Sequence, residues 1–263
     1  MAVTIPFHMC NPYLRFMYRI DEEVRSILDT FQGMMDAGLS ASRAWREPIA
    51  PVIDHTNLRP EAAEPDIRRL CEEAGQHGFA SVCVYPCFVP LCAELLADAA
   101  PAVCTVVGFP HGASTSSTKA AETRLAVEAG AREIDMVLRI GALKEGRLQV
   151  VFDDIRAVTD AAHSAHPDTI VKVILETCLL DTEQKISACL LARDAGAHFV
   201  KTSTGFSTGG ATAADVRLMA LAVGGRLRVK ASGGIRTRAD ALLMLGHGAD
   251  RLGSSASVVI IEP

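Results

Sequence analysis

The sequence has no long apolar run and no basic stripe, and aromatic residues make up only 5% of its 263 residues. The longest stretch without a charged residue or a histidine, residues 78–93, contains two prolines and is shorter than the roughly 20 residues that span a bilayer. The formal net charge is −5, with acidic and basic residues interspersed. These absences argue against a membrane protein and against binding to a nucleic acid or an anionic membrane. A small-molecule ligand is the remaining expectation.

A secretion signal is also missing from residues 1–20, where prolines and a histidine interrupt the apolar stretch that a signal peptide needs. A transit peptide remains an open alternative. The eight cysteines lie mostly in apolar runs, which favours reduced thiols in a cytoplasmic protein. Cys83, Cys87 and Cys92 are spread over a strand end, a proline-containing loop and a helix, with no paired histidine motif. We therefore expect no zinc site.

Two patterns of apolar residues, one typical of helices and one typical of strands, alternate along most of the chain. Helical spacing recurs in segments such as TKAAETRLAVEAGA and TAADVRLMALAVGG, and several of these segments close on Ala-Gly or Gly-Ala. Eight strands alternating with helices over about 200 residues are typical of an α/β protein of the (β/α)8 TIM-barrel class. The short apolar, β-branched runs that predict the strands are residues 51–54, 80–85, 102–108, 133–138, 170–176, 198–201, 227–230 and 250–253.

A doubly wound open sheet is the alternative fold, disfavoured because no strand leads into a Gly-x-Gly-x-x-Gly helix start. Residues 1–49 stand outside the repeat. We expect them to form an N-terminal extension whose helix packs on the bottom or side of a catalytic barrel formed by residues 50–263. The apolar residues at helical spacing that predict this helix, within residues 21–38, are Val24, Ile27, Leu28, Phe31, Met34 and Met35.

Polar residues gather where the predicted strands end, which is where barrel enzymes carry their active sites. The most unusual segment is HFVKTSTGFSTGGAT (198–212), in which Lys201 ends an apolar run and no other charge follows until Asp215. A single lysine at a strand end commonly reaches solvent. Two lysines that end neighbouring strands, each before a turn of small residues, favour a shared pocket. The strand-end residues are Asp54, Cys83, Asp135, Glu176 with Thr177, Lys201 and Lys230.

Two such lysines can act as a catalytic pair. Burial and a neighbouring ammonium group both disfavour the charged form of an amine, so one of the two can be neutral near pH 7. A neutral amine adds to a carbonyl to form a Schiff base, which withdraws electrons and allows a neighbouring C–C bond to form or break. Asp135 would supply the carboxyl group that moves the protons. Lys201, Lys230 and Asp135 together predict a lysine-based aldolase that requires no metal.

Eight motifs follow one another in barrel order: DHTNL (54–58), SVCVYP (81–86), CTVVGFPHG (104–112), EIDMV (133–137), VKVILETC (171–178), FVKTSTGFSTGGAT (199–212), VKASGGIRT (229–237) and RLGSSA (251–256). From about Ile49 to Ile261 the chain resembles the deoxyribose-phosphate aldolase family. The resemblance implies a (β/α)8 fold and reversible cleavage of 2-deoxy-D-ribose 5-phosphate to acetaldehyde and D-glyceraldehyde 3-phosphate. It also implies that neither a metal nor an organic cofactor is needed.

The resemblance carries roles to individual residues. It implies that Lys201 forms the Schiff base, that Lys230 is the second lysine, and that Asp135 is the proton-transfer carboxylate. Lys230 is expected to exchange protons and to keep the amine of Lys201 neutral. Asp54 is expected to orient Lys230, with a turn or helix-cap residue as the alternative. Cys83 is expected near the substrate, with a buried structural thiol as an equal alternative.

Glycine-rich turns follow the predicted seventh and eighth strands, where barrels often bind phosphate through backbone N–H groups. Any one glycine is more simply explained as a turn residue, but two such turns on neighbouring loops predict a phosphate site. Arg236 would bind the phosphate or else cap the following helix. Some family members have a lysine in place of Phe206 and a serine in place of Ala256, so we expect mainly backbone donors here. The expected substrate-binding residues are Cys83, Thr204, Gly205, Gly233, Gly234, Arg236, Gly253, Ser254 and Ser255.

Other functions stay open beside this one. Another Schiff-base aldolase acting on sugar phosphates would share the same residues. A barrel isomerase or synthase that uses acid–base chemistry alone is disfavoured by the pairing of Lys201 with Lys230. A non-catalytic phosphometabolite-binding barrel would be expected to have lost a member of the lysine, lysine, aspartate set. The expected partners are a sugar phosphate of deoxyribonucleotide catabolism and further copies of the chain, as a dimer or tetramer in the cytoplasm.

Overall fold

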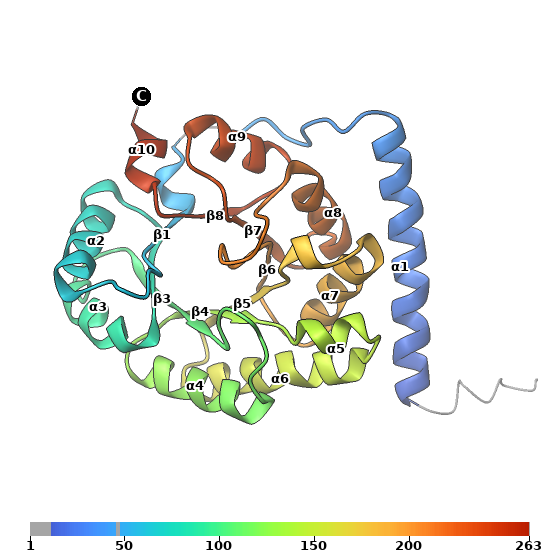
Figure 1. Ribbon diagram of the computed structural model, residues 1–263, viewed down its shortest axis with the longest axis horizontal. Helices are drawn as coiled ribbons and strands as arrows, with labels where there is room; N and C mark the ends of the chain where they lie inside the picture. Colours follow the sequence, from blue (N-terminus) through green and yellow to red (C-terminus); the bar gives the residue numbers. More distant parts are fainter. Residues whose placement is uncertain (1–11, 46–47, 263) are drawn as a thin grey trace, which may run out of the picture.

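A closed barrel of eight parallel strands forms the centre of the molecule (Figure 1). The computed structural model describes residues 12–45 and 48–262, and within them strand β8 pairs with β1 to close the barrel. The predicted (β/α)8 fold is confirmed, and each of the eight predicted runs contains or overlaps a strand. The strands are β1 (Ile53–Thr56), β2 (Ser81–Val84), β3 (Ala102–Val107), β4 (Glu133–Val137), β5 (Ile170–Ile174), β6 (Phe199–Lys201), β7 (Arg228–Ser232) and β8 (Arg251–Ser254).

Helices surround the barrel and connect consecutive strands (Figure 1). The α-helices are α1 (Pro12–Asp36), α2 (Glu64–His77), α3 (Val89–Leu95), α4 (Ser116–Glu128), α5 (Ile140–Lys144), α6 (Leu148–Ala165), α7 (Thr182–Asp194), α8 (Ala213–Val223), α9 (Arg238–Gly246) and α10 (Ser257–Ile261). The short 3-10 helices among the described residues are η2 (Ala50–Val52), η3 (Pro86–Phe88) and η4 (Thr177–Leu179). No helix of the described residues is long and apolar enough to cross a membrane.

Local sequence fixes where several of these helices begin and end. Four of them start after a threonine or aspartate whose side chain accepts a hydrogen bond from a backbone N–H in the first turn, which satisfies a donor that the helix leaves unpaired. These N-cap residues are Thr115, Asp181, Thr212 and Thr237. Helices α2 and α8 end at Gly78 and Gly224, both in the left-handed conformation that glycine adopts without strain.

The two faces of the strands have different surroundings. Because successive strand residues point to opposite faces, Ile134 and Met136 of β4 face the helices, where they are buried in the main apolar core. Glu133 and Asp135 of the same strand point into the barrel and are also buried. Layers of branched apolar side chains usually fill a barrel interior. Charged residues on β4 are therefore the first sign that this interior is specialised.

Helix α1 packs on the side of the barrel, beside α7 and α8, which is one of the two positions predicted (Figure 1). The ring of Phe16 meets that of Phe152 of α6 with 5.3 Å between centroids. Glu23 forms an ion pair of 2.6 Å with Arg193 of α7. Both contacts fasten the helix to the outer ring of helices rather than to the strands.

The bounds of α1 differ from the predicted residues 21–38. The helix begins at Pro12, and its apolar face already includes the buried Ile20. Val24 is buried as the spacing predicts, whereas Met35 is exposed. The N-terminal part of the predicted extension, residues 1–11, lies outside the described residues. The division of the chain at residue 49 stays a prediction.

Candidate active site

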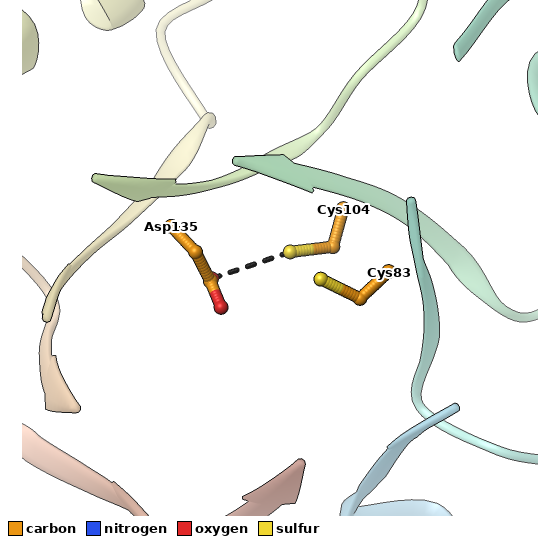
Figure 2. Close-up of side chains that lie close together, drawn as sticks. All are labelled: Cys83, Cys104 and Asp135. Carbon is orange, nitrogen blue, oxygen red and sulfur yellow. Dashed lines mark hydrogen bonds between the residues drawn. The ribbon is translucent and has the colours of Figure 1, made fainter. Parts of the chain in front are cut away.

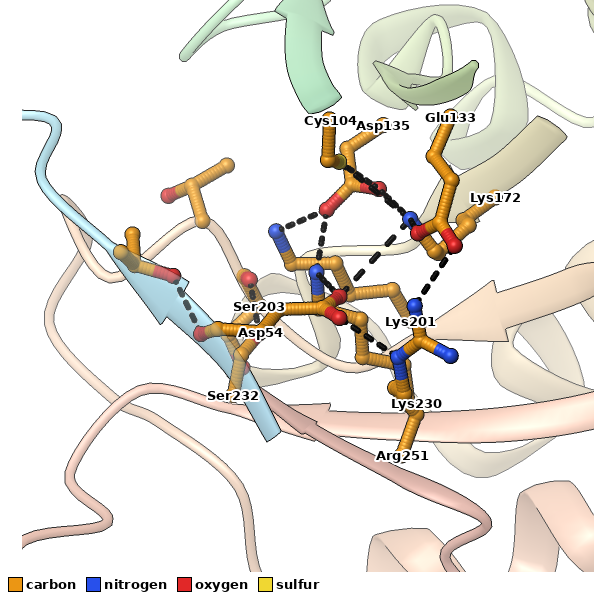
Figure 3. Close-up of polar contacts among 12 residues, drawn as sticks. Asp54, Cys104, Glu133, Asp135, Lys172, Lys201, Ser203, Lys230, Ser232 and Arg251 are labelled. Carbon is orange, nitrogen blue, oxygen red and sulfur yellow. Dashed lines mark hydrogen bonds and ion pairs between the residues drawn. The ribbon is translucent and has the colours of Figure 1, made fainter. Parts of the chain in front are cut away.

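Six strands bring charged side chains together inside the barrel (Figure 3). Strand register pairs Asp135 of β4 with Lys172 of β5, and Lys201 of β6 with Lys230 of β7. Lys230 is in turn paired with Arg251 of β8. Neighbouring strands in register present their inward side chains at similar depth, so these residues form one contiguous cluster.

Asp135 lies at the centre of the cluster. Its Oδ2 atom is 2.7 Å from the Nζ atoms of both Lys201 and Lys230, and its Oδ1 atom is 2.7 Å from Nζ of Lys172. Burial alone would raise the pKa of Asp135, but the three lysines hold it well below its usual value. Asp135 is therefore a carboxylate that accepts from three amines.

Asp54 holds Lys230 from the other side. Its Oδ2 atom forms an ion pair of 2.5 Å with Nζ of Lys230, and its Oδ1 atom accepts from Nε of Arg251 at 2.5 Å and from the Ser81 hydroxyl at 2.7 Å. Burial would raise the pKa of Asp54, but Lys230, Lys172 and Arg251 together hold it below its ordinary value. This geometry supports an orienting role for Asp54. Its place within β1 excludes the turn and helix-cap alternatives.

Three members of the cluster were not expected from the sequence. Lys172 is fully buried and forms an ion pair of 2.6 Å with Glu133, in addition to its contact with Asp135. Arg251 donates to Glu133 through Nη2 at 2.6 Å. Lys172 could have been found from IVKVI, because a lysine inside an otherwise apolar strand is rarely buried without a charged partner.

The cluster has one positive charge in excess when every group is ionised. Its cations are Lys172, Lys201, Lys230 and Arg251, and its carboxylates are Asp54, Glu133 and Asp135. Burial disfavours the ammonium forms of Lys172 and Lys230, but nearby carboxylates outweigh it and raise the pKa of both above the ordinary value. Lys201 contacts a single carboxylate, which it shares with both of these amines.

A cavity of about 700 Å³ opens above the cluster, and Lys201 is the cluster member that lines it. The side chain of Lys201 is 4% exposed, whereas those of Lys172 and Lys230 are 0% exposed. Within the described part of the chain, Lys201 is therefore the buried amine that a bound molecule can reach. The other predicted site residues that line the cavity are Thr204, Gly205, Gly233, Gly234, Arg236, Gly253, Ser254 and Ser255.

Cys83 does not line this cavity. It is fully buried in a small apolar cluster with Cys104, Val106 and Leu58, and its thiol lies beside that of Cys104 (Figure 2). This position favours the structural thiol over the predicted contact with substrate.

Ligand atoms of Cys83, Cys104 and Asp135 lie within 4.8 Å of one another, close enough to share a metal ion. The Asp135 carboxylate is already engaged by three lysines, however, and Nζ of Lys172 lies 3.3 Å from Sγ of Cys104. A cation would have to enter a cluster that already has excess positive charge. We therefore propose no metal at this position. The groups with metal-like spacing in the described residues include neither Cys87 nor Cys92.

Two of the predicted phosphate-site glycines are closely packed against their neighbours. Gly233 has a φ of +86°, and a Cβ atom there would lie 3.0 Å from Cα of Gly210 in the loop after β6. At Gly253 a Cβ atom would lie 3.1 Å from Cε of Lys230, so this glycine leaves room for the lysine side chain. Arg236 does not cap α9, because Thr237 occupies the N-cap; its side chain borders the cavity instead.

Glu176 links two loops at the mouth of the barrel. It has a φ of 59°, unusual for a residue other than glycine, and its side chain is buried. Its carboxylate accepts from the backbone N–H of Thr204 at 3.3 Å and from the Thr204 hydroxyl. The loop after β5 thus holds the first residues that follow Lys201. Nothing in the strand-end pattern indicates this contact.

A (β/α)8 barrel whose cavity reaches one lysine, in front of buried carboxylates and further lysines, has the architecture of a class I aldolase. The DeoC/LacD aldolase family model matches residues 49–254, which is most of the barrel. The chain belongs to this family. Helix α1 lies outside the matched residues.

Individual relatives agree with the family. The deoxyribose-phosphate aldolase of Carboxydothermus hydrogenoformans is 56% identical over 214 residues, covering 81% of this chain and 94% of the relative. The deoxyribose-phosphate aldolase of Thermotoga maritima is 49% identical over 245 residues, covering 93% and 96%. The tetrameric deoxyribose phosphate aldolase of Aeropyrum pernix superposes with a TM-score of 0.76 at 35% identity, covering 81% and 89% of the two chains.

Proposed function

We propose that the chain is a deoxyribose-phosphate aldolase that cleaves 2-deoxy-D-ribose 5-phosphate reversibly to acetaldehyde and D-glyceraldehyde 3-phosphate. The observation that carries the proposal is the position of Lys201, which lines the cavity with its amine 2.7 Å from Asp135. The deoxyribose-phosphate aldolases related to this chain support the substrate.

The amine of Lys201 adds to C1 of the open-chain sugar, and loss of water gives an iminium ion. The C2–C3 bond then breaks, because its electron pair moves toward the iminium nitrogen to form an enamine, while the C3 hydroxyl loses its proton and becomes the aldehyde of glyceraldehyde 3-phosphate. Protonation of the enamine at C2 and addition of water release acetaldehyde and return the free amine.

Asp135 and Lys230 are the proposed proton-transfer groups. The pKa of Asp135 is lowered and that of Lys230 is raised, so the resting pair consists of a carboxylate and an ammonium. Asp135 is therefore the proton acceptor and Lys230 the proton donor at the start of the cycle. Asp54 orients Lys230 through the 2.5 Å ion pair and takes no proton itself.

The phosphate end of the substrate occupies the glycine-rich loops. Backbone N–H groups around Gly205, Gly234 and Ser255 bind the dianion, and the Ser255 hydroxyl adds a further donor. Phe206 supplies no charge. Its side chain is half exposed, and its ring packs edge-on against that of Phe109, with 5.3 Å between the ring centroids. The same loop that begins at Lys201 thus serves both the chemistry and the binding.

A retro-aldol assay tests the proposal directly. Purified protein is incubated with 2-deoxy-D-ribose 5-phosphate, and acetaldehyde is measured through the oxidation of NADH by alcohol dehydrogenase. Release of acetaldehyde is the expected result. Binding without turnover would favour a phosphometabolite-binding barrel, and interconversion of ribose 5-phosphate with a ketose phosphate would favour an isomerase. Cleavage of a different sugar phosphate alone would indicate another Schiff-base aldolase.

Assembly and location are proposals of the same kind. The Aeropyrum pernix relative is tetrameric, and we extend to this chain the expectation of a homo-oligomer, dimer or tetramer. The seven described cysteines carry free thiols, which fits a reducing compartment such as the cytoplasm. Light scattering coupled to size-exclusion chromatography would give the oligomeric state.

A further inference from the structure

His55 lies next to the charged cluster in the sequence, but its side chain points away from the barrel interior. His55 follows Asp54 on β1, so its imidazole faces the surrounding helices while Asp54 faces the barrel interior. The ring is buried, with Nε2 2.7 Å from Oε2 of Glu73 on α2 and Nδ1 2.9 Å from the hydroxyl oxygen of Ser257 on α10. The ring of Phe79 packs against it at 5.0 Å between centroids. His55 thus joins α2, which lines the cavity, to α10.

The direction of these hydrogen bonds follows from their chemistry. A carboxylate only accepts, so the hydrogen of a neutral imidazole resides on Nε2 and points to Glu73. Burial lowers the pKa of His55; Glu73 opposes this shift and His77, also on α2, adds to it. The five residues of α10 carry no charge. In the neutral form Nδ1 is therefore an acceptor, and the single hydroxyl hydrogen of Ser257 is shared between Nδ1 and the carbonyl oxygen of Ser254, each 2.9 Å from the hydroxyl oxygen.

Ser257 is connected to both glycine-rich loops. Its hydroxyl donates to the carbonyl oxygen of Ser254, the last residue of β8, at 2.9 Å. The Ser254 hydroxyl donates to the carbonyl of Ile235 at 2.8 Å and accepts from the backbone N–H of Ala256 at 3.0 Å. Ile235 follows Gly234 in the loop after β7. One chain of polar contacts therefore fixes the two loops to each other and to His55.

We infer that His55 is a positioning residue for the phosphate end of the substrate, acting through Ser257 on the loop that carries Ser254 and Ser255. The inference rests on the proposed function, because it takes the substrate phosphate as the ligand of that loop. Ser257 is fully buried and does not line the cavity, so it touches no substrate. His55 and Glu73 border the cavity, and a variant of Ser257 therefore separates action through the loop from direct contact.

Three variants test the inference. An asparagine at position 55 places an amide near the site of Nδ1 and retains the contact with Ser257. A glutamine places its amide near the site of Nε2 and retains only the contact with Glu73. We expect His55→Gln and Ser257→Ala each to raise KM for deoxyribose 5-phosphate about tenfold, the effect of losing one hydrogen bond, with kcat within about twofold of wild type. His55→Asn should remain near wild type.

Unphosphorylated deoxyribose separates the phosphate end from the reacting centre. Its slow cleavage should be unchanged in all three variants, because only remote binding energy is lost. His77→Gln is the control, since His77 is exposed at the end of α2 and does not line the cavity; it should behave as wild type with both substrates. The dissociation constant of inorganic phosphate, measured by titration calorimetry, should rise in His55→Gln and Ser257→Ala alone.

Equal losses with both substrates would mean that His55 only supports the fold, and the inference would be wrong. An effect of His55→Gln without one of Ser257→Ala would mean that the imidazole touches the phosphate itself, which also overturns it. If wild type does not cleave deoxyribose 5-phosphate, the proposed function fails. The phosphate titration still decides the inference in that case, because it does not depend on turnover.

Discussion

Replacing Lys172 by methionine would remove a fully buried cation from the charged cluster while keeping an unbranched side chain of similar length. Its Nζ atom forms ion pairs of 2.7 Å with Asp135 and 2.6 Å with Glu133, and lies 3.7 Å from Asp54. Removing one partner of a buried ion pair typically costs about 3–5 kcal/mol, because the other charge is left without compensation. Here Asp135 keeps two lysines and Glu133 keeps Arg251, so we expect a loss near the lower end, about 3 kcal/mol.

For a chain of this size, such a loss corresponds to a fall in Tm of about 6–12 °C. The free energy of unfolding is measured by urea denaturation followed by circular dichroism, with Lys144→Met as the control because Lys144 is exposed on α5. Adding Glu133→Gln to Lys172→Met should recover about 1 kcal/mol, since it removes a carboxylate that the first substitution leaves short of partners. A loss below about 1 kcal/mol for Lys172→Met, or one equal to that of Lys144→Met, would refute the electrostatic account of the cluster.

Three further substitutions test the roles of single residues. Lys201→Arg should abolish cleavage and leave the far-ultraviolet circular dichroism spectrum unchanged, because a guanidinium group is too basic to become a neutral nucleophile; retained turnover would exclude Lys201 as the nucleophile. Lys230→Leu removes an ammonium group next to Lys201, so the rate should fall and the pH optimum of kcat/KM should move upward. An unchanged pH profile would show that the two amines do not interact. Ser255→Asp sets a carboxylate against the phosphate, and should sharply lower kcat/KM for deoxyribose 5-phosphate while leaving deoxyribose cleavage nearly unchanged; equal losses would place Ser255 in the chemistry or the fold.

Much of the site was predictable because strand ends in a barrel converge on one mouth. Reading the last polar residue of each apolar run was enough to bring Lys201, Lys230 and Asp135 together, and the structure puts their charged atoms within contact distance. The same reading overlooked Lys172, because Glu176 is the last polar residue of the predicted run 170–176, whereas β5 itself ends at Ile174. Successive strand residues face alternately inward and outward, and this alternation, rather than the position at the strand end, would have identified Lys172 as an inward-facing residue.

Other features depend on contacts that a linear pattern does not encode. Cys83 and Asp135 lie close together inside the barrel, yet Asp135 contacts three lysines whereas Cys83 packs beside Cys104 and does not line the cavity. Only the closure of the barrel decides which strands face each other across the interior. The hydrogen bond between Glu176 and Thr204 joins two loops of irregular conformation. Residue types do not predict which residues of two such loops will meet.

The identity of the nucleophile is the central claim, and trapping the imine tests it most directly. Protein is incubated with acetaldehyde, reduced with sodium borohydride, digested and mapped by mass spectrometry. We predict an ethyl group on Nζ of Lys201, the cluster lysine that lines the cavity, and no adduct on Lys230 or Lys172. An adduct on Lys230 would reverse the roles assigned to the two lysines. The absence of any acetaldehyde-dependent adduct from a catalytically active sample would contradict the Schiff-base mechanism itself.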